Sequence, residues 1–119
     1  MTLSSSSGIS FGDGHFFGIE KGSETVGTIV PEEVTIDKMS GKITSESTNL
    51  AASGKDTIIL YNSRVSISSL VMVTPSAAGG CEPFVYEAVP SSGFVTIRVK
   101  NMASSACTSA YTLSFLVVN

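Results

Sequence analysis

The stretch Gly93-Phe-Val-Thr-Ile-Arg-Val-Lys-Asn101, followed after a Ser/Ala-rich connection by Ala110-Tyr-Thr-Leu-Ser-Phe-Leu-Val-Val-Asn119, decides the fold class. In both runs apolar residues recur at every second position, which is the period of a β-strand with one buried face. In the second run Leu116 and Val118 make the other face apolar as well, so we expect that strand to lie at the centre of a sheet or beneath a partner. The expected buried residues are Val95, Ile97, Val99, Tyr111, Leu113, Phe115 and Val117.

The residues before this stretch predict further short strands separated by turns. Residues 34–38 and 42–46 flank Met39-Ser40-Gly41, a pattern typical of a β-hairpin. Asn62-Ser63 marks a turn, in which Asn62 tolerates left-handed backbone and caps the turn itself. The remaining strands are expected at 56–61, at 65–74 with a bulge near Ser68-Ser69, and at 83–89, with turns at 75–80 and 90–93.

About seven short strands, with turn signals at intervals of roughly 8–12 residues, predict an all-β, antiparallel β-sandwich over residues 31–119. Residues 1–30 differ, because they are rich in serine and glycine and show no sustained periodicity. We expect them to form an extended N-terminal arm. The arm either folds its apolar residues back onto its own core or docks them on a neighbouring subunit. The candidate assembly contacts are Phe11, Phe16, Phe17 and Ile19.

Composition limits the classes of function. Charged residues make up 14% of the 119-residue chain, against roughly 25% in an average domain. So little surface charge favours a homo-oligomer, a dimer or trimer, over a free monomer. The net charge of −3 divides into −5 for residues 1–37 and +2 for the rest, so no basic patch for nucleic acid is expected.

Targeting signals are not expected either. The first residues form neither a basic nor an apolar signal-peptide region, and no apolar run approaches the ~20 residues of a membrane span. We therefore expect synthesis in a host cytoplasm without export by a signal peptide, and no membrane partner.

The sequence predicts no catalytic, metal-binding or cofactor-binding residues. His15, the single histidine, has no partner at ligand spacing. Gly12-Asp13-Gly14 lacks the strand and the Gly-Lys-Ser/Thr that a phosphate loop requires. No serine lies in a Gly-x-Ser-x-Gly elbow. We expect a protein that is not an enzyme.

Cys81 and Cys107 are the only chemically distinctive pair in the sequence. Each precedes an expected strand, and the strands between them run out and back, so both can lie at one end of the sandwich. A disulfide between them would be worth on the order of 3–4 kcal/mol. Synthesis in a cytoplasm favours free thiols instead, and both alternatives stay open.

The order of several short patterns resembles a module of tailed-phage structural proteins. These are Gly41-Lys-Ile-Thr-Ser, Leu50-Ala-Ala, Ile58-Ile-Leu-Tyr-Asn-Ser-Arg-Val-Ser, Ser69-Leu-Val-Met-Val, Gly93-Phe-Val-Thr-Ile and Leu113-Ser-Phe-Leu-Val-Val. The likeness covers about residues 40–119 and departs from the module in Ser91-Ser92 and in both cysteines. It implies an oligomeric β-sandwich of the virion and no catalytic residues.

The resemblance implies a capsid decoration (cement) subunit, located in the virion, whose partners are its own copies and the major capsid protein. The shortness of the chain favours this over the first alternative, a short fibre or collar component. The second alternative is a glycan-binding β-sandwich module, which a tyrosine or phenylalanine face with convergent acids or amides would indicate.

Overall fold

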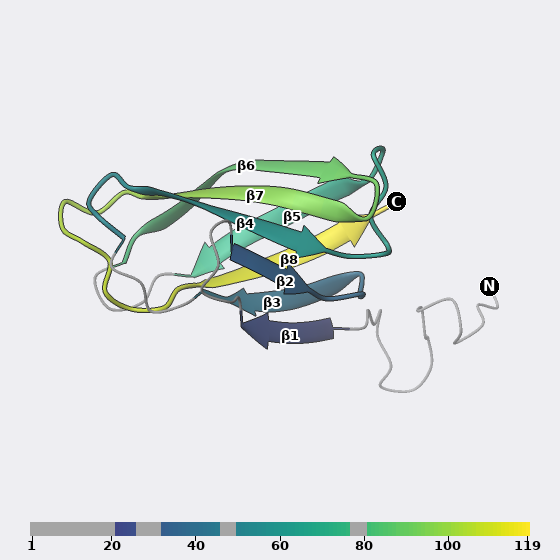
Figure 1. Ribbon diagram of the computed structural model, residues 1–119, viewed down its shortest axis with the longest axis horizontal. Helices are drawn as coiled ribbons and strands as arrows, with labels where there is room; N and C mark the ends of the chain where they lie inside the picture. Colours follow the sequence, from purple (N-terminus) through teal and green to yellow (C-terminus); the bar gives the residue numbers. More distant parts are fainter. Residues whose placement is uncertain (1–20, 26–31, 46–49, 77–80) are drawn as a thin grey trace, which may run out of the picture.

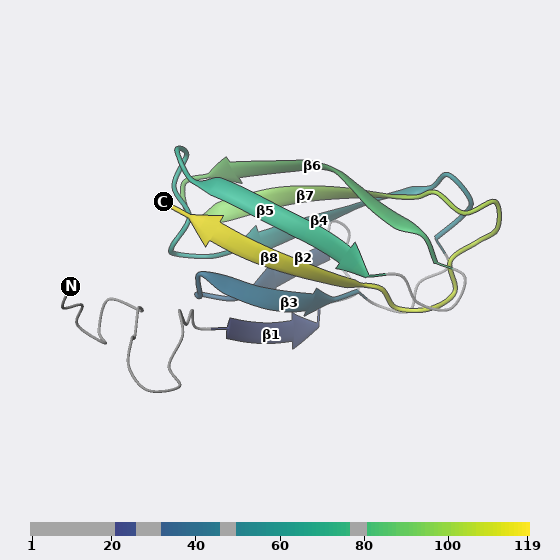
Figure 2. The same cartoon turned by 180° about the vertical axis from the view of Figure 1, so that it is seen from behind.

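The protein is an all-β sandwich of two four-stranded sheets, seen from opposite sides in Figure 1 and Figure 2. The computed structural model describes residues 21–25, 32–45, 50–76 and 81–119. These residues form eight strands, and the predicted all-β sandwich is confirmed. The first sheet has the order β1 (Lys21–Thr25), β3 (Ser40–Thr44), β8 (Thr112–Val118) and β5 (Leu70–Ser76), and the second has the order β2 (Glu32–Thr35), β4 (Lys55–Tyr61), β7 (Phe94–Asn101) and β6 (Pro83–Ser91).

Both sheets are mixed, although the sequence predicts antiparallel ones. β1 pairs parallel with β3, and β2 pairs parallel with β4, whereas the other neighbouring strands are antiparallel. The order places β8 between β3 and β5, and β7 between β4 and β6. The central position expected for the last strand is therefore confirmed. The edges of the first sheet are β1 and β5.

The hairpin predicted around Met39-Ser40-Gly41 is wrong, because β2 and β3 belong to different sheets. The chain leaves β2, keeps Ile36 in the core at 4% exposure, and crosses to the first sheet. Two contacts hold this crossing: the Asn62 side-chain amide donates to the Lys38 carbonyl at 2.6 Å, and the Val117 amide donates to the Met39 carbonyl at 2.7 Å. Residues that look like a turn thus connect the two layers.

The interior is filled by alternate residues of both sheets, as the period-two pattern predicts. All seven residues expected to be buried on β7 and around β8 are at most 3% exposed. Close packing also explains Gly41, since a Cβ there would meet the Gly22 carbonyl oxygen and the Phe115 ring, each at 2.8 Å. The rest of the buried apolar core includes Val34, Ile36, Ile43, Ile58, Leu60 and Val65.

Two strands differ in detail from the prediction. The strand expected at 65–74 begins only at Leu70, and it continues through Pro75, which was predicted to start a turn. A proline is tolerated there because β5 is an edge strand. The bulge predicted near Ser68-Ser69 is wrong, because these residues precede β5, and β6 contains a bulge that was not predicted, between Val85 and Glu87. The predicted turn before β7 is confirmed, and Gly93 adopts a φ of 86° in it.

Part of the predicted arm belongs to the sandwich. Residues 21–25 form β1 and extend the first sheet beyond β3. The sequence hides this strand because its residues are small and polar, and four of its five positions are exposed. The predicted boundary at residues 30 and 31 and the assembly contacts Phe11, Phe16, Phe17 and Ile19 lie outside the described residues, as does His15. No helix among the described residues is long and apolar enough to cross a membrane.

Candidate interaction surfaces

The outer face of the first sheet carries a group of exposed aliphatic side chains. Register places Leu70 opposite Val118 and Met72 opposite Leu116 on the neighbouring strands β5 and β8. Leu70, Met72 and Val118 are 60%, 55% and 44% exposed, and Leu116 is half-buried. We call these four residues the aliphatic patch. Their side chains have no hydroxyl or charged group that could hydrogen-bond to water, so the patch suits a partner with an apolar surface.

The sequence predicts half of this patch. Leu116 and Val118 are the two residues whose position on the second face of the last strand called for a partner. Leu70 and Met72 were missed, because only the β5–β8 register shows that they lie beside the other two. A run such as Leu70-Val-Met-Val does not reveal which of its side chains face outward.

A hollow of about 430 Å³ lies beside the patch, over β1, β3 and β8. Its charged side chains among the described residues are those of Lys21 and Lys42, and the other lining residues are small or apolar: Gly22, Ser23, Ser40, Gly41, Ser114 and Phe115. The lining thus combines two cationic side chains with small and apolar residues.

The outer face of the second sheet has a different composition, with aromatic rings that are paired to charged groups. The Tyr61 hydroxyl donates to Glu33 Oε1 at 3.2 Å, and its ring lies 6.2 Å from that of Phe94. The nearby carboxylate raises the pKa of Tyr61, first by its charge and then by the hydrogen bond. Tyr61 is therefore a neutral donor that orients a carboxylate at the surface.

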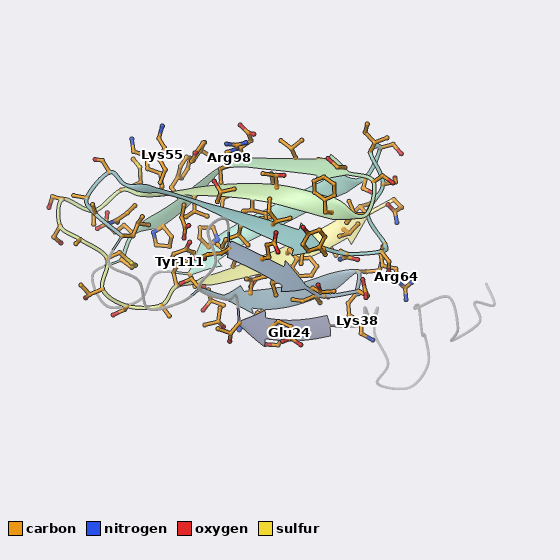
Figure 3. The ribbon with its side chains drawn as sticks, in the orientation of Figure 1. Glu24, Lys38, Lys55, Arg64, Arg98 and Tyr111 are labelled. Atoms are coloured by element: carbon orange, nitrogen blue, oxygen red, sulfur yellow. A yellow bond between two sulfur atoms is a disulfide. The ribbon has the colours of Figure 1, made fainter. Side chains whose placement is uncertain are left out.

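The same face continues toward the other end of β4 with two cationic contacts. Lys55 Nζ lies 5.8 Å from the centroid of the Tyr86 ring, within reach of a cation–π interaction. Arg98 Nε donates to Glu87 Oε1 at 3.2 Å. Figure 3 shows Lys55 and Arg98 directed away from the interior on this side of the molecule. Exposed ion pairs of this kind contribute little stability, but they satisfy the polar groups of the face.

The two cysteines are brought together by the structure. Cys81 and Cys107 form a disulfide with their Cα atoms 4.6 Å apart. Cys107 also exchanges two backbone hydrogen bonds with Leu50. The disulfide therefore joins the start of β6 in the second sheet to the loop that leads into β8 in the first sheet. It acts as a tie between layers rather than as a reactive site.

Asn101 is the polar centre of the same end, and the sequence gives no sign of it. Its side chain is 1% exposed. The amide donates to the carbonyls of Leu50, Ala51 and Ser105 at 3.0–3.3 Å, and Oδ1 accepts from the Ala103 amide at 3.0 Å. One side chain thus satisfies two loops that are about fifty residues apart, which no local pattern can indicate.

A buried tyrosine links the two sheets near this end. The Tyr111 hydroxyl donates to Asp56 Oδ2 at 2.8 Å, and Asp56 Oδ1 also accepts from the Thr57 amide at 3.0 Å. Burial is the largest cause that raises the pKa of Tyr111 well above its usual range, followed by the charges of Asp56 and Glu32. Two carboxylates near one phenol resemble an acid–base site, but Tyr111 is 1% exposed and Glu32 is 5% exposed, so the arrangement is structural.

Asn62 has a similar role at the opposite end. It caps its own turn, as predicted, by accepting from the Arg64 amide at 2.9 Å. It does so without using the left-handed backbone that asparagine tolerates, since Ser53 is the only non-glycine residue with positive φ among the described ones. Arg64 is exposed, and Figure 3 places it with Lys38 at this end of the sandwich.

The described residues contain no cluster of three or more histidine, cysteine, aspartate or glutamate side chains that could hold a metal ion. Comparisons of the chain with models of known protein families, with curated proteins and with solved structures find no match.

Proposed function

We propose that the chain is a non-enzymatic structural subunit of a tailed-phage particle, of the capsid decoration type, which binds and stabilises the head. The aliphatic patch is the observation that carries this proposal. Leu70, Met72 and Val118 are exposed although the interior of the sandwich is already filled. Exposed apolar groups that gather on one sheet face are typical of a protein that works in contact with other subunits.

The disulfide, the low proportion of charged residues and the sequence resemblance support the same proposal. The Cys81–Cys107 bridge ties the two sheets together, which suits a particle that is released into an oxidising medium. The partners are then other copies of the chain and the major capsid protein, and the part of the predicted arm that precedes β1, residues 1–20, supplies further apolar contacts. A short fibre or collar component of the same particle would use these surfaces in a similar way.

The test is to purify phage particles from the strain that encodes the chain and to identify their proteins by mass spectrometry. The chain should be present at a fixed ratio to the major capsid protein. Cryo-electron microscopy should then show sandwich-sized density at regular positions on the outside of the head. Density at the neck or tail would favour the fibre or collar alternative. If purified particles lack the chain, the proposal fails.

A glycan-binding module is the second candidate, and the outer face of the second sheet favours it. Tyr61 and Tyr86 are 41% and 40% exposed, and the Tyr61 hydroxyl orients the Glu33 carboxylate beside an aromatic ring. Aromatic faces with nearby carboxylates suit the apolar and hydroxyl sides of a sugar ring. Retention on a glycan array that Tyr61→Ala abolishes, and that the control Val89→Ala on the same face preserves, would support this candidate over the structural one.

A further inference from the structure

Lys21, the first described residue of the first sheet, lies at the same level along the strands as the aliphatic patch, but at the opposite edge of the sheet. Lys21 at the start of β1 pairs with Ser40 on β3, Ser40 pairs with Leu116 on β8, and Leu116 pairs with Met72 on β5. The described chain of the first sheet therefore starts at the level of the patch. Three strand spacings, about 14 Å, separate the two edges.

The segment that precedes β1 has the composition that the patch requires. Residues 9–19 read Ile-Ser-Phe-Gly-Asp-Gly-His-Phe-Phe-Gly-Ile, which is five large apolar side chains in eleven positions. Fully extended, such a segment spans roughly 35 Å, which is ample for reaching a neighbouring molecule.

Charge favours this face over the other one. Residues 9–20 carry Asp13 and Glu20 and no lysine or arginine. The outward positions of the described strands in the first sheet carry Lys21 and Lys42, and the exposed acid of that sheet, Glu24, lies on the edge strand β1 at the position that pairs with the inward-facing Ile43. The outer face of the second sheet instead mixes both signs, with Glu33, Glu87, Lys55, Arg98 and Lys100. An acidic, apolar segment is therefore complementary to the first face and not to the second.

Either the chain's own arm or that of a second copy is long enough to reach the patch, and the opposite edges favour the second copy. To reach the patch on its own sheet, the arm must cross β3, whose outward residues Ser40 and Lys42 offer it no apolar side chain. A second copy placed beside β5 meets no such barrier. A contact in which one edge gives and the opposite edge receives is heterologous, and it closes into a ring when the rotation between copies allows.

We propose that the aliphatic patch is the docking site for residues 9–19 of a second copy of this chain, so that each copy gives an arm at β1 and receives one at β5 and β8. Phe16 and Phe17 pack against Leu70, Met72 and Leu116, and the arm's acids lie near Lys42. The inference rests on the proposed role as an assembly subunit and names the surface through which its copies join.

The first experiment measures self-association of the full chain by sedimentation velocity. The variant Leu70→Ser/Met72→Ser should weaken association at least tenfold, and Phe16→Ser/Phe17→Ser should weaken it equally. The matched control Phe84→Ser/Val89→Ser, which removes two exposed apolar residues from the second sheet, should change it less than twofold. Combining the patch and arm substitutions should add little, because both remove the same contact. Additive losses, or an equal loss in the control, would overturn the proposal.

The second experiment keeps the patch intact, and so does not depend on the folding of the variants. A photoreactive phenylalanine analogue replaces Phe17, and the protein is mixed with an isotopically labelled copy before irradiation. Mass spectrometry should find cross-links between chains, to peptides that contain residues 70–72 or 116–118. Cross-links within one chain, cross-links to the second sheet, or no cross-link to the patch would each overturn the proposal.

Both experiments use the isolated protein without any particle. A chain that is found on phage heads but shows no cross-link between copies would remove this inference and leave the proposed function standing. A chain that exchanges arms but is missing from particles would do the reverse.

Discussion

The two ends of the sandwich are held in different ways. At one end, where β4, β6 and β8 begin on the left in Figure 1, segments of both sheets are joined by the disulfide, Asn101 and the Tyr111–Asp56 hydrogen bond. We call this the bridged end. At the other end the side-chain ties include those of Asn62, Asp37 and Asn119, and the Asn119 amide donates to the Arg64 carbonyl at 3.0 Å. We call this the open end.

The open end also carries exposed apolar side chains. Ile67 in its loop is 80% exposed, Leu70 and Val118 of the patch lie beside it, and β1 begins there. The difference indicates a division of labour. The bridged end maintains the fold by covalent and buried polar contacts, and the open end presents apolar side chains to other molecules. The following predictions test this division, beginning with the largest expected effect on stability.

Removing the disulfide should cause the largest loss in the free energy of unfolding. The loop that it closes has a sequence separation of 26 residues, and the chain-entropy relation then gives about 3.5 kcal/mol. Cys81→Ser/Cys107→Ser should lower the free energy of unfolding in urea by that amount, and reduction of the native protein should have the same effect. Mass spectrometry of the unreduced protein should first show a deficit of about two hydrogens. If both thiols are alkylated without reductant, the bridge is not formed in that protein.

Asn101→Ala should be nearly as severe. It leaves the carbonyls and amides of two loops without their buried partner, which costs about 3 kcal/mol in total. Asn62→Ala is the matched control at the open end, since Asn62 is also 1% exposed but loses only two side-chain hydrogen bonds. It should cost about half as much. Equal losses in urea denaturation would show that the two ends are held equally well.

Tyr111→Phe should cost about 2 kcal/mol at neutral pH, the value of a buried hydrogen bond to a carboxylate. Because folding raises the pKa of Tyr111, its contribution is complete below the unfolded value of about 10. It is lost as the pH rises above that value toward the folded pKa.

The measurement is the free energy of unfolding in urea between pH 8 and 11. The native protein should lose stability above pH 10, and Tyr111→Phe should lose less. Tyr61→Phe is the control, because Tyr61 also donates to a carboxylate but lies at the surface. Its pH profile should stay closer to that of the native protein than the Tyr111→Phe profile does, because the pKa of Tyr61 is also raised but its side chain is exposed to solvent. A Tyr111→Phe profile identical to the native one would contradict the buried contact.

Removal of residues 1–20 should have the smallest effect, below about 0.5 kcal/mol for the isolated domain at dilute concentration. All eight strands remain in that truncation. Removal of residues 1–30 also takes away β1 and uncovers the edge of β3, and should cost measurably more while leaving a cooperative transition. If the shorter truncation fails to fold, residues 1–20 belong to the core, and the apolar side chains of the open end are not available to other molecules.

The parts of this architecture that the sequence predicts are those that depend on neighbouring residues. The alternation on β7 and β8 is local, and it placed the buried residues correctly because each strand has one face toward the core. The crossing at residues 36–39 was misjudged because a turn-like sequence is compatible with a hairpin and with a passage between sheets. Contacts with Asn62 and Val117, distant in sequence, decide between them.

The candidate surfaces divide in the same way. Leu116 and Val118 could be predicted, because two apolar faces on one strand are visible in the sequence. Asn101 and the Asp56–Tyr111 contact could not, because each joins residues about fifty positions apart. β1 was missed because a strand made of Lys, Gly, Ser, Glu and Thr has no apolar face. Its pairing with β3, and not a periodic pattern, identifies it as a strand.

Pro75 limits the way in which copies of the protein can join. It lies in β5, the last strand of the first sheet on that side, opposite Leu113. A proline has no amide hydrogen, so an incoming strand would find a gap in the row of donors that it needs. Edge strands interrupted in this way resist the continuous hydrogen-bonded addition that produces fibrils. A protein that exposes aliphatic side chains along such a strand can therefore assemble through them without polymerising along its backbone.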